Sequence, residues 1–255
     1  MSFDRWRSLV DGAEIDVGSA IPDSAVLHYP FLERTTNSIV EVLEGSDGEV
    51  DGDVDNISNT WWQGYAEQHD GGLIWLDELN EWAENLSGTS GFAITVETNN
   101  DGHIFGGRFN GDSPPVWAVS IGTDDGFAEA GSSGDVAFTI RDGLGNSIES
   151  WSGDLNASDG NRHRIFTRKT GTTSEDIEIW VDGTELSLSF DGEDTLDDTE
   201  FNSFTDEVPF FDNSSETGRS VRGDPLSGGV LDNAVFYEDP TEDDIANDYN
   251  VQPWS

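Results

Sequence analysis

Apolar and polar side chains alternate along many short stretches of this chain, which is the pattern of β-strands with one buried face. Between residues 91 and 98, for example, Phe92, Ile94 and Val96 fall on one side of an extended chain. Further strands are predicted at residues 26–31, 103–109, 116–121, 135–141, 162–169, 176–181 and 230–237. Turn-forming residues separate these strands, so the pattern predicts an all-β protein, an antiparallel jelly-roll β-sandwich with one core.

Helix signals are sparse. Thr241 and Asp244 have the spacing of a capping box, so a short C-terminal helix is expected to begin there. Residues 76–86 are compatible with a helical turn. The irregular segment 1–24 is predicted to be an N-terminal arm used for docking or assembly, and residues 25–255 are predicted to form the single β domain.

The charge of the chain is extreme. It has 53 acidic and 11 basic residues, a formal net charge of -42, and Lys169 is its sole lysine. Such a charge opposes compaction in dilute buffer, whereas at about 1 M salt the Debye length falls to about 3 Å and the carboxylates are screened from one another. Nine tryptophans and fourteen phenylalanines argue for a folded core rather than disorder. We therefore expect a protein of an extreme halophile or its virus, located in high salt, extracellularly or on a virion surface.

Composition also excludes several classes of function. The chain has no cysteine, which excludes disulfides and thiolate metal sites. A membrane-spanning helix needs about 20 consecutive apolar residues, and no apolar run here is that long, so no membrane insertion is expected. Phosphates would be repelled, so nucleic acid is an unsuitable partner.

Several segments, in their order along the chain, are similar to a laminin-G-like domain of the concanavalin A-like superfamily. The likeness is carried by an acidic turn at 42–52, by strands at 72–77, 92–97 and 161–166, by an apolar strand at 177–183 that ends in Val-Asp-Gly, by a closing strand at 229–237 and by an acidic helix at 241–249. The resemblance covers about residues 25–250 and implies a jelly-roll fold. That superfamily includes lectins, adhesion modules, glycosidases and structural proteins, so fold alone leaves the function open.

The sequence argues against catalysis. Laminarinase-type members of the superfamily carry Glu-x-Asp-x-x-Glu on one strand, and no glutamate here begins that pattern. Glu175-Asp176-Ile177-Glu178 comes nearest, with the wrong spacing. A non-catalytic protein is therefore expected, and a laminarinase-like glycoside hydrolase is kept as the alternative.

Basic residues concentrate in one predicted strand. Arg162, Arg164 and Arg168 would share one face of it, and Trp180 of the following strand would lie beside them. One interpretation is a groove in which guanidinium groups bind carboxylate or sulfate groups of an acidic glycan while Trp180 stacks on a sugar. The other is a set of cross-strand ion pairs. Trp62 and Tyr65 are further candidates for a sugar platform, or for core and subunit contacts.

Two cation sites are considered. The resemblance implies a structural calcium, or another cation, held by Asp232 with backbone carbonyls near His28 and Tyr29. The alternating acids between Asp47 and Asp55 resemble half of an ion-binding loop, but no glutamate closes it, and a solvated acidic turn is the alternative. No cofactor is required for chemistry.

These observations favour a non-catalytic recognition or assembly protein that binds glycans or glycoproteins of a host surface. The absence of an export signal before residue 25 favours a structural protein of a haloarchaeal virus, such as a spike, turret or tail fibre, present as a homo-oligomer on a larger assembly. A secreted haloarchaeal lectin-like ectodomain and a purely structural capsid decoration remain alternatives.

Overall fold

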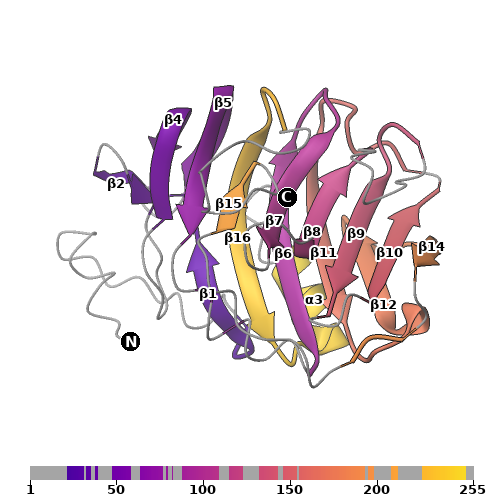
Figure 1. The fold of residues 1–255 in the computed structure, drawn as a ribbon. Helices are drawn as coiled ribbons and strands as arrows, with labels where there is room; N and C mark the ends of the chain where they lie inside the picture. Colours follow the sequence, from indigo (N-terminus) through magenta and orange to yellow (C-terminus); the bar gives the residue numbers. More distant parts are fainter. Residues whose placement is uncertain are drawn as a thin grey trace.

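The structure is a computed structural model, and it describes residues 22–31, 33–35, 38–39, 48–58, 64–76, 79, 82, 88–108, 115–122, 132–142, 146–153, 155–192, 195–197, 208–211 and 226–250. The strands in these residues pair antiparallel and form two layers that face each other across one core (Figure 1). The predicted fold class, an antiparallel jelly-roll β-sandwich with a short C-terminal helix, is confirmed.

The layer at the front of Figure 1, here called the front layer, contains six strands besides part of β5. In spatial order these are β15 (Val208–Phe210), β7 (Gly102–Arg108), β8 (Pro115–Ile121), β9 (Val136–Arg141), β10 (Ser147–Ser152) and β14 (Leu188–Gly192). The back layer contains β13 (Thr184–Glu185), β12 (Ile177–Val181), β11 (Arg162–Lys169), β6 (Ser90–Glu97), β16 (Val230–Glu238) and β1 (Ala25–Tyr29), the last paired with β16.

One long strand joins the two layers. β5 (Gly64–Leu76) pairs with β16 of the back layer near its start, at Ala66 and Glu67, and with β15 of the front layer near its end, at residues 74–76. β4 (Gly48–Ser58) accompanies β5 along the other edge, and the short strands β2 (Glu33–Thr35) and β3 (Ser38–Ile39) extend that edge. The sandwich is therefore closed on one side by a hairpin that belongs to both layers.

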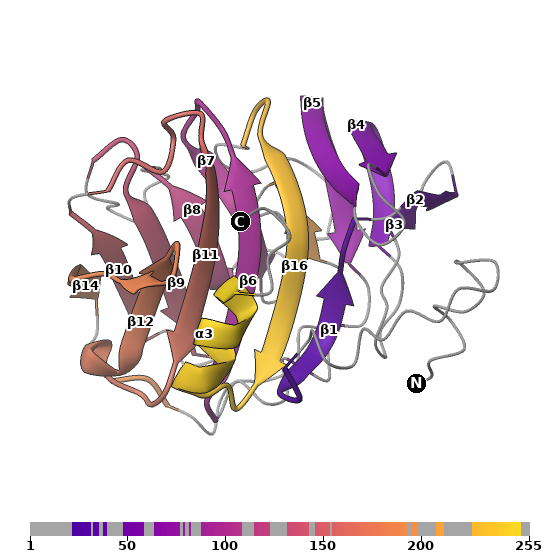
Figure 2. The same cartoon turned by 180° about the vertical axis from the view of Figure 1, so that it is seen from behind.

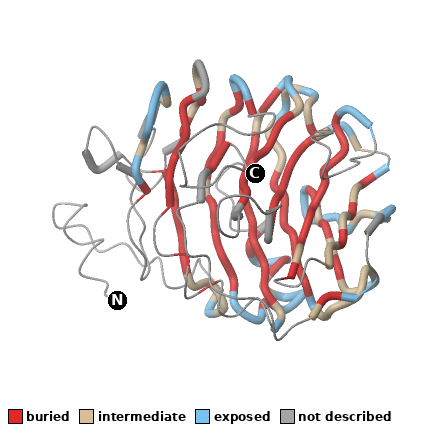
Figure 3. The backbone as a smooth tube through the Cα atoms, in the orientation of Figure 1, coloured by how far each residue is buried: buried red, intermediate tan, exposed pale blue. Residues whose placement is uncertain are grey.

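The core lies between the layers, where the strands are largely buried (Figure 3). It is rich in aromatic side chains. The ring of Trp82 lies 4.9 Å, centroid to centroid, from both Trp117 and Phe236 in edge-to-face contacts, the geometry that aromatic quadrupoles favour. The alternation in the sequence predicted the inward faces of β6, β8 and β9 correctly: Phe92, Ile94, Val96, Trp117, Val119, Ile121, Val136, Phe138 and Ile140 are all buried there.

The predicted C-terminal helix is α3 (Glu242–Asn250), and it lies on the outer face of the back layer (Figure 2). It begins with the expected reciprocal cap: the amide of Thr241 donates to Asp244 Oδ2 at 2.8 Å, and the amide of Asp244 donates to Thr241 Oγ1 at 3.2 Å. Ile245 of the helix is buried in a second apolar cluster that includes Phe166 and Tyr237. This packing covers part of the outer face of the back layer.

The prediction of a turn in the acidic segment was wrong for its described part. Residues 48–58 form strand β4, in which Glu49, Asp51 and Asp53 are exposed while Val50 and Val54 pack against the core. This is strand alternation, so the carboxylates point out along a strand instead of converging around an ion, and the predicted half of an ion-binding loop is not formed. Asp47 lies outside the described residues.

Other predictions are tested only in part. Of the N-terminal arm, only residues 22–24 are described. Of the helical turn expected at 76–86, the described residues Leu76, Leu79 and Trp82 are all buried. In the part of the chain that the structure describes, no helix is both long and apolar enough to cross a membrane.

Candidate functional site

The structure places two of the predicted ligand-binding arginines inside the fold. Arg164 is 5% exposed and holds Asp248 of α3 through two contacts, Nε to Oδ2 at 2.7 Å and Nη2 to Oδ1 at 2.6 Å. Arg168 holds Glu178 through two contacts of 2.9 Å across β11 and β12. Arg168 and Glu178 thus form the cross-strand pair that was the alternative interpretation, and neither guanidinium faces a groove.

The other members of that predicted groove are only partly accessible. Arg162 is 28% exposed at its side chain and lies 3.5 Å from Glu97 and 3.6 Å from Asp232. Trp180 packs beside the cluster under α3, and its indole nitrogen donates to Glu178 at 3.2 Å. Trp62 lies outside the described residues, as does the side chain of Tyr65, so their predicted role is untested.

Asp232, the predicted cation ligand, is 1% exposed on the outer face of the back layer. Burial raises the pKa of its carboxyl group to about 7, against the lowering effect of the guanidinium groups of Arg162 and Arg164. Where the resemblance implied a cation beside Asp232, the structure places the guanidinium of Arg162, 3.6 Å from its carboxylate. Among the described residues no cluster of three or more His, Cys, Asp or Glu side chains is suited to a metal ion. The cation at Asp232 stays a prediction.

Polar side chains gather instead at one end of the sandwich, at the turns that link the strands of both layers. This end is the upper end in Figure 2. We call this surface the loop rim. Its described residues are 98–101 between β6 and β7, Gly122 after β8, 132–135 before β9, 155–161 between β10 and β11, His163 at the start of β11, 182–183 between β12 and β13, and 226–229 before β16.

The turn between β6 and β7 is the hub of the loop rim. Its sequence, Asn99-Asn100-Asp101-Gly102, consists of residues that favour tight turns, and the amide of Asn100 donates to Thr98 Oγ1 at 2.9 Å. The three side chains then reach different neighbours. Asn100 Nδ2 donates to the carbonyl of Ser227 at 2.8 Å, and the Asn99 amide packs against Gly160.

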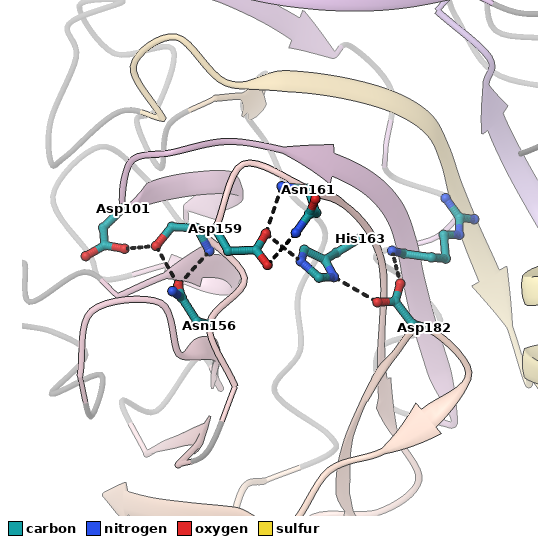
Figure 4. Close-up of polar contacts among 8 residues, drawn as sticks. Asp101, Asn156, Asp159, Asn161, His163 and Asp182 are labelled. Carbon is teal, nitrogen blue, oxygen red and sulfur yellow. Dashed lines mark hydrogen bonds and ion pairs between the residues drawn. The ribbon is translucent and has the colours of Figure 1, made fainter.

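Asp101 joins two further loops. Its Oδ1 accepts from the amide of Gly134 at 3.0 Å. It also accepts from the hydroxyl of Ser158 at 3.0 Å (Figure 4). Gly134 has a φ of +88°, and a Cβ there would lie 2.3 Å from Asn156 Oδ1, so only glycine fits. One carboxylate therefore fixes the segment before β9 and the segment before β11 relative to the β6–β7 turn.

A histidine between two carboxylates fixes the remaining part of the loop rim. His163 Nδ1 lies 2.8 Å from Asp182 Oδ2, and its Nε2 lies 3.2 Å from Asp159 Oδ1 (Figure 4). Hydrogen bonding to Asp182 raises the pKa of His163. The pKa of Asp159 is lowered, chiefly by hydrogen bonds from Asn161. Opposite charges and hydrogen bonds favour the ionised forms of the carboxylates and the protonated form of the histidine.

Asp182 is the aspartate of the Val-Asp-Gly segment that carried part of the resemblance. Asp182 and Gly183 both have positive φ, +51° and +75°, which is the geometry of a two-residue hairpin turn between β12 and β13. The carboxylate is thus held at the end of the hairpin, where its Oδ1 accepts from the amide of Arg164 at 2.9 Å.

The chemistry available at the loop rim is that of hydrogen bonding. The exposed side chains of Asn99, Asn100, Asn156 and Asn161 present amide donors and acceptors, and the carboxylates add acceptors. The Ser158 hydroxyl lies beside Asp101 and Asn156, and His163 lies between two aspartates, so Ser158 and His163 do not form a nucleophile–base pair. Such a surface can hold hydroxyl groups.

Sequence reasoning did not select these residues. It predicted turn-forming residues between the strands and a strand at 161–166, and within that strand it assigned a binding role only to Arg162 and Arg164. The usable signal is the position of the polar turns: in an antiparallel sandwich, the turn after β6 and the turns before β9, β11 and β16 must lie at the same end.

Comparison with known proteins agrees with this fold. No protein-family model matches the sequence, and no curated protein matches it. Among solved structures, the chain is similar to the botulinum neurotoxin type G receptor-binding domain, with a TM-score of 0.56, 13% identity, and coverage of 90% of this chain and 52% of that one. It is similar to the binding domain of botulinum neurotoxin DC in complex with SialylT, with a TM-score of 0.56, 11% identity, and coverage of 91% and 52%.

It is also similar to the Trypanosoma rangeli sialidase in complex with sialic acid, with a TM-score of 0.62, 11% identity, and coverage of 99% and 38%. The chain therefore spans about half of the botulinum binding domains that it matches, and less of the sialidase. At these identities the likeness shows the fold, a β-sandwich of the kind found in sheet-rich binding domains.

Proposed function

We propose that this protein is a non-catalytic glycan-binding module and that the loop rim is its binding surface. The observation that carries the proposal is the hub at Asn99, Asn100 and Asp101, which holds three neighbouring loops and leaves exposed amides beside them. The fold likeness to receptor-binding and sialic-acid-bound proteins supports the same class of ligand.

Pre-organisation is the physical reason why such a surface suits a glycan. Each sugar hydroxyl contributes little on its own, because a net hydrogen bond is worth about 1 kcal/mol. A loop that must be ordered on binding would cancel that gain. In this protein Asp101 and His163 already fix the loops, so the exposed amides can bind without that cost.

A glycan array probed with the purified protein tests the proposal. We expect binding to a defined set of glycans, reduced about tenfold or more by Asn99→Ala combined with Asn100→Ala. The matched control is Asn247→Ala on the exposed side of α3, which should leave binding unchanged. Absence of binding to any glycan, with the protein folded by circular dichroism, would refute the proposal.

The non-catalytic part has its own test. A glycosidase would release reducing sugar from the bound glycan or from a β-glucan on prolonged incubation, whereas we expect none. If the protein does release reducing sugar, and a single carboxylate-to-amide substitution abolishes that release, the alternative of a laminarinase-like hydrolase is favoured.

We further propose that the module works at a surface bathed in concentrated salt, as a spike, turret or tail-fibre component of a haloarchaeal virus, with a secreted haloarchaeal ectodomain as the alternative. The net charge of -42 supports the salt-rich setting. Several copies on one particle would turn weak sugar contacts into firm attachment. Antibody labelling of purified particles and of host cells, by electron microscopy, separates the viral from the cellular setting, and light scattering measures the expected homo-oligomer.

A further inference from the structure

The exposed polar side chains of the loop rim are amides, carboxylates and the hydroxyls of Ser132, Ser133 and Ser227. Its described acids are Asp101, Asp135, Asp159 and Asp182, and the adjacent strand ends add Glu97 and Asp232. The basic groups at this end are Arg162, His163, Arg164 and the buried His103 at the start of β7. Acidic groups therefore outnumber basic ones, and a ligand at the loop rim meets a negative local field in addition to that of the whole chain.

The basic groups near the loop rim are already engaged. Arg164 is buried with Asp248, Arg162 faces Glu97 and Asp232, and His163 lies between Asp159 and Asp182. The other lysine and arginine side chains described, Arg141, Arg168 and Lys169, lie at the far ends of β9 and β11, because those two strands start at the loop rim. A carboxylate or sulfate group arriving at the loop rim would thus meet no guanidinium fork that is open for a bidentate contact in the described residues.

The side-chain amides of the loop rim retain both donors and acceptors that a ligand can use. Within the described residues Asn156 Oδ1 accepts from the amide of Ser158 while its Nδ2 makes no hydrogen bond, and Asn161 Nδ2 donates to Asp159 while its Oδ1 accepts none. The amide of Asn99 contributes both a donor and an acceptor. A hydroxyl group donates and accepts at once, so a set of mixed donors and acceptors complements it. A carboxylate or sulfate only accepts.

We infer that the loop rim takes neutral, hydroxyl-rich glycans and excludes sialylated and sulfated ones. The inference rests on the proposed function and gives its ligand a chemical class. It departs from the acidic glycan that the arginine-rich strand suggested, because the structure commits those arginines to carboxylates of the protein. It also departs from the sialic acid and SialylT present in two structures of similar fold.

Competing oligosaccharides with one shared core test the inference. Lactose-based and mannose-based probes, unmodified, sialylated or sulfated, are titrated against the full chain by calorimetry or surface plasmon resonance. The titrations are made at about 0.15 M and about 1 M salt, where the Debye length is about 8 Å and about 3 Å. The higher salt removes the long-range repulsion by the acidic surface. A preference for the neutral probe that persists there must come from contacts at the loop rim.

We expect at least one neutral probe to bind and its sialylated or sulfated forms to bind more than tenfold more weakly at both salt concentrations. Equal or tighter binding of an acidic probe would overturn the inference and leave the proposed function standing. Binding of no probe at either salt concentration would overturn both.

A matched pair of variants locates the effect. Asn99→Asp keeps the shape of an exposed loop-rim side chain and removes its donor, so it should weaken the neutral probe several-fold without gaining affinity for acidic ones. Asn247→Asp adds the same charge on α3 and should change nothing. Equal effects of the two variants would show that net charge, and not the loop rim, governs binding, and would overturn the inference.

Discussion

Arg164 of β11 and Asp248 of α3 form a two-contact ion pair although 84 residues separate them in the sequence. Both side chains are at most 5% exposed. The hydroxyl of Tyr237 also donates to the Asp248 carboxylate, and the Arg164 guanidinium also donates to the carbonyl of Asn233. The helix is therefore fastened to the back layer by a buried polar network in which each charge has partners.

Removing one partner of this pair should destabilise the protein strongly. Asp248→Ala leaves a buried guanidinium without its counter-ion, and we expect the free energy of unfolding to fall by about 3–5 kcal/mol. Urea unfolding at constant high salt measures the change. Asp243→Ala, on the exposed side of the same helix, is the control. An Arg164→Met, Asp248→Leu double variant should recover much of the loss, and a loss equal to that of Asp248→Ala would contradict this account of the pair.

Asp232 should make the protein less stable as pH rises. Because burial raises its pKa to about 7, the folded state binds a proton that the unfolded state releases near pH 4, and stability falls between these values. Asp232→Asn removes the titration, so we expect it to raise the free energy of unfolding at pH 8 by about 2–4 kcal/mol and to leave it nearly unchanged at pH 4. Thermal unfolding as a function of pH measures this, with the exposed Asp51→Asn as control. The same pH slope in Asp232→Asn as in the parent would contradict it.

Much of the fold could be predicted from the sequence, because burial of one strand face enforces a period of two. β6, β8 and β9 follow that rule with large apolar residues at Phe92, Trp117 and Phe138, and the helix after Thr241 carries its own cap. β10 was missed because serines, Ser150 and Ser152, occupy two of its buried positions. β4 was taken for a turn because acids fill its exposed face.

The site was harder to predict, because it depends on contacts between distant segments. The alternation placed Arg164 and Arg168 on one face correctly, but it could not show that α3 and Glu178 cover and pair them. Asn100 finds its partner 127 residues away at Ser227. Local patterns identify a polar turn as such. Only the order of the strands decides which polar turns lie together.

Asp101 should control the order of the loop rim. Asp101→Ala removes the acceptor for Gly134 and Ser158, and we expect a loss of about 1–3 kcal/mol together with faster amide exchange at residues 132–135 and 155–160. Hydrogen–deuterium exchange with mass spectrometry measures both segments. Asp101→Asn keeps an acceptor oxygen and should restore much of the protection. Equal exchange in the parent and Asp101→Ala would show that these loops are held by other contacts.

Salt should stabilise the whole protein. With a net charge of -42, self-repulsion opposes folding in dilute buffer, and we expect the melting temperature to rise by more than about 10 °C between about 0.1 M and about 1 M potassium chloride. Differential scanning calorimetry measures the rise, and matched concentrations of an uncharged osmolyte control for effects other than screening. A melting temperature independent of salt would remove the support for a halophilic setting.

His163 should make the stability of the loop rim depend on pH, because its protonated ring holds two carboxylates. Its pKa is raised above 6.5 by hydrogen bonding to Asp182, so its stabilising contribution is complete below pH about 6.5 and is lost as pH rises through the folded value. The pKa of Asp182 is lowered, because the hydrogen bonds from His163 and Arg164 outweigh its burial. Its contribution is therefore lost on acidification below about pH 4.

His163→Gln should accordingly lower the melting temperature most between about pH 4.5 and 6.5 and much less above pH 8. His69→Gln, on β5 and outside the contacts of His163 with Asp159 and Asp182, is the matched control, since its ring lies 3.5 Å from Asp55 with both side chains well exposed. Asp182→Asn should reproduce the effect of His163→Gln, because each variant removes one end of the same 2.8 Å contact. An effect of His163→Gln that is constant from pH 5 to pH 9 would mean that the histidine acts through packing, and that the charge on its ring plays no part in holding Asp182 and Asp159 together.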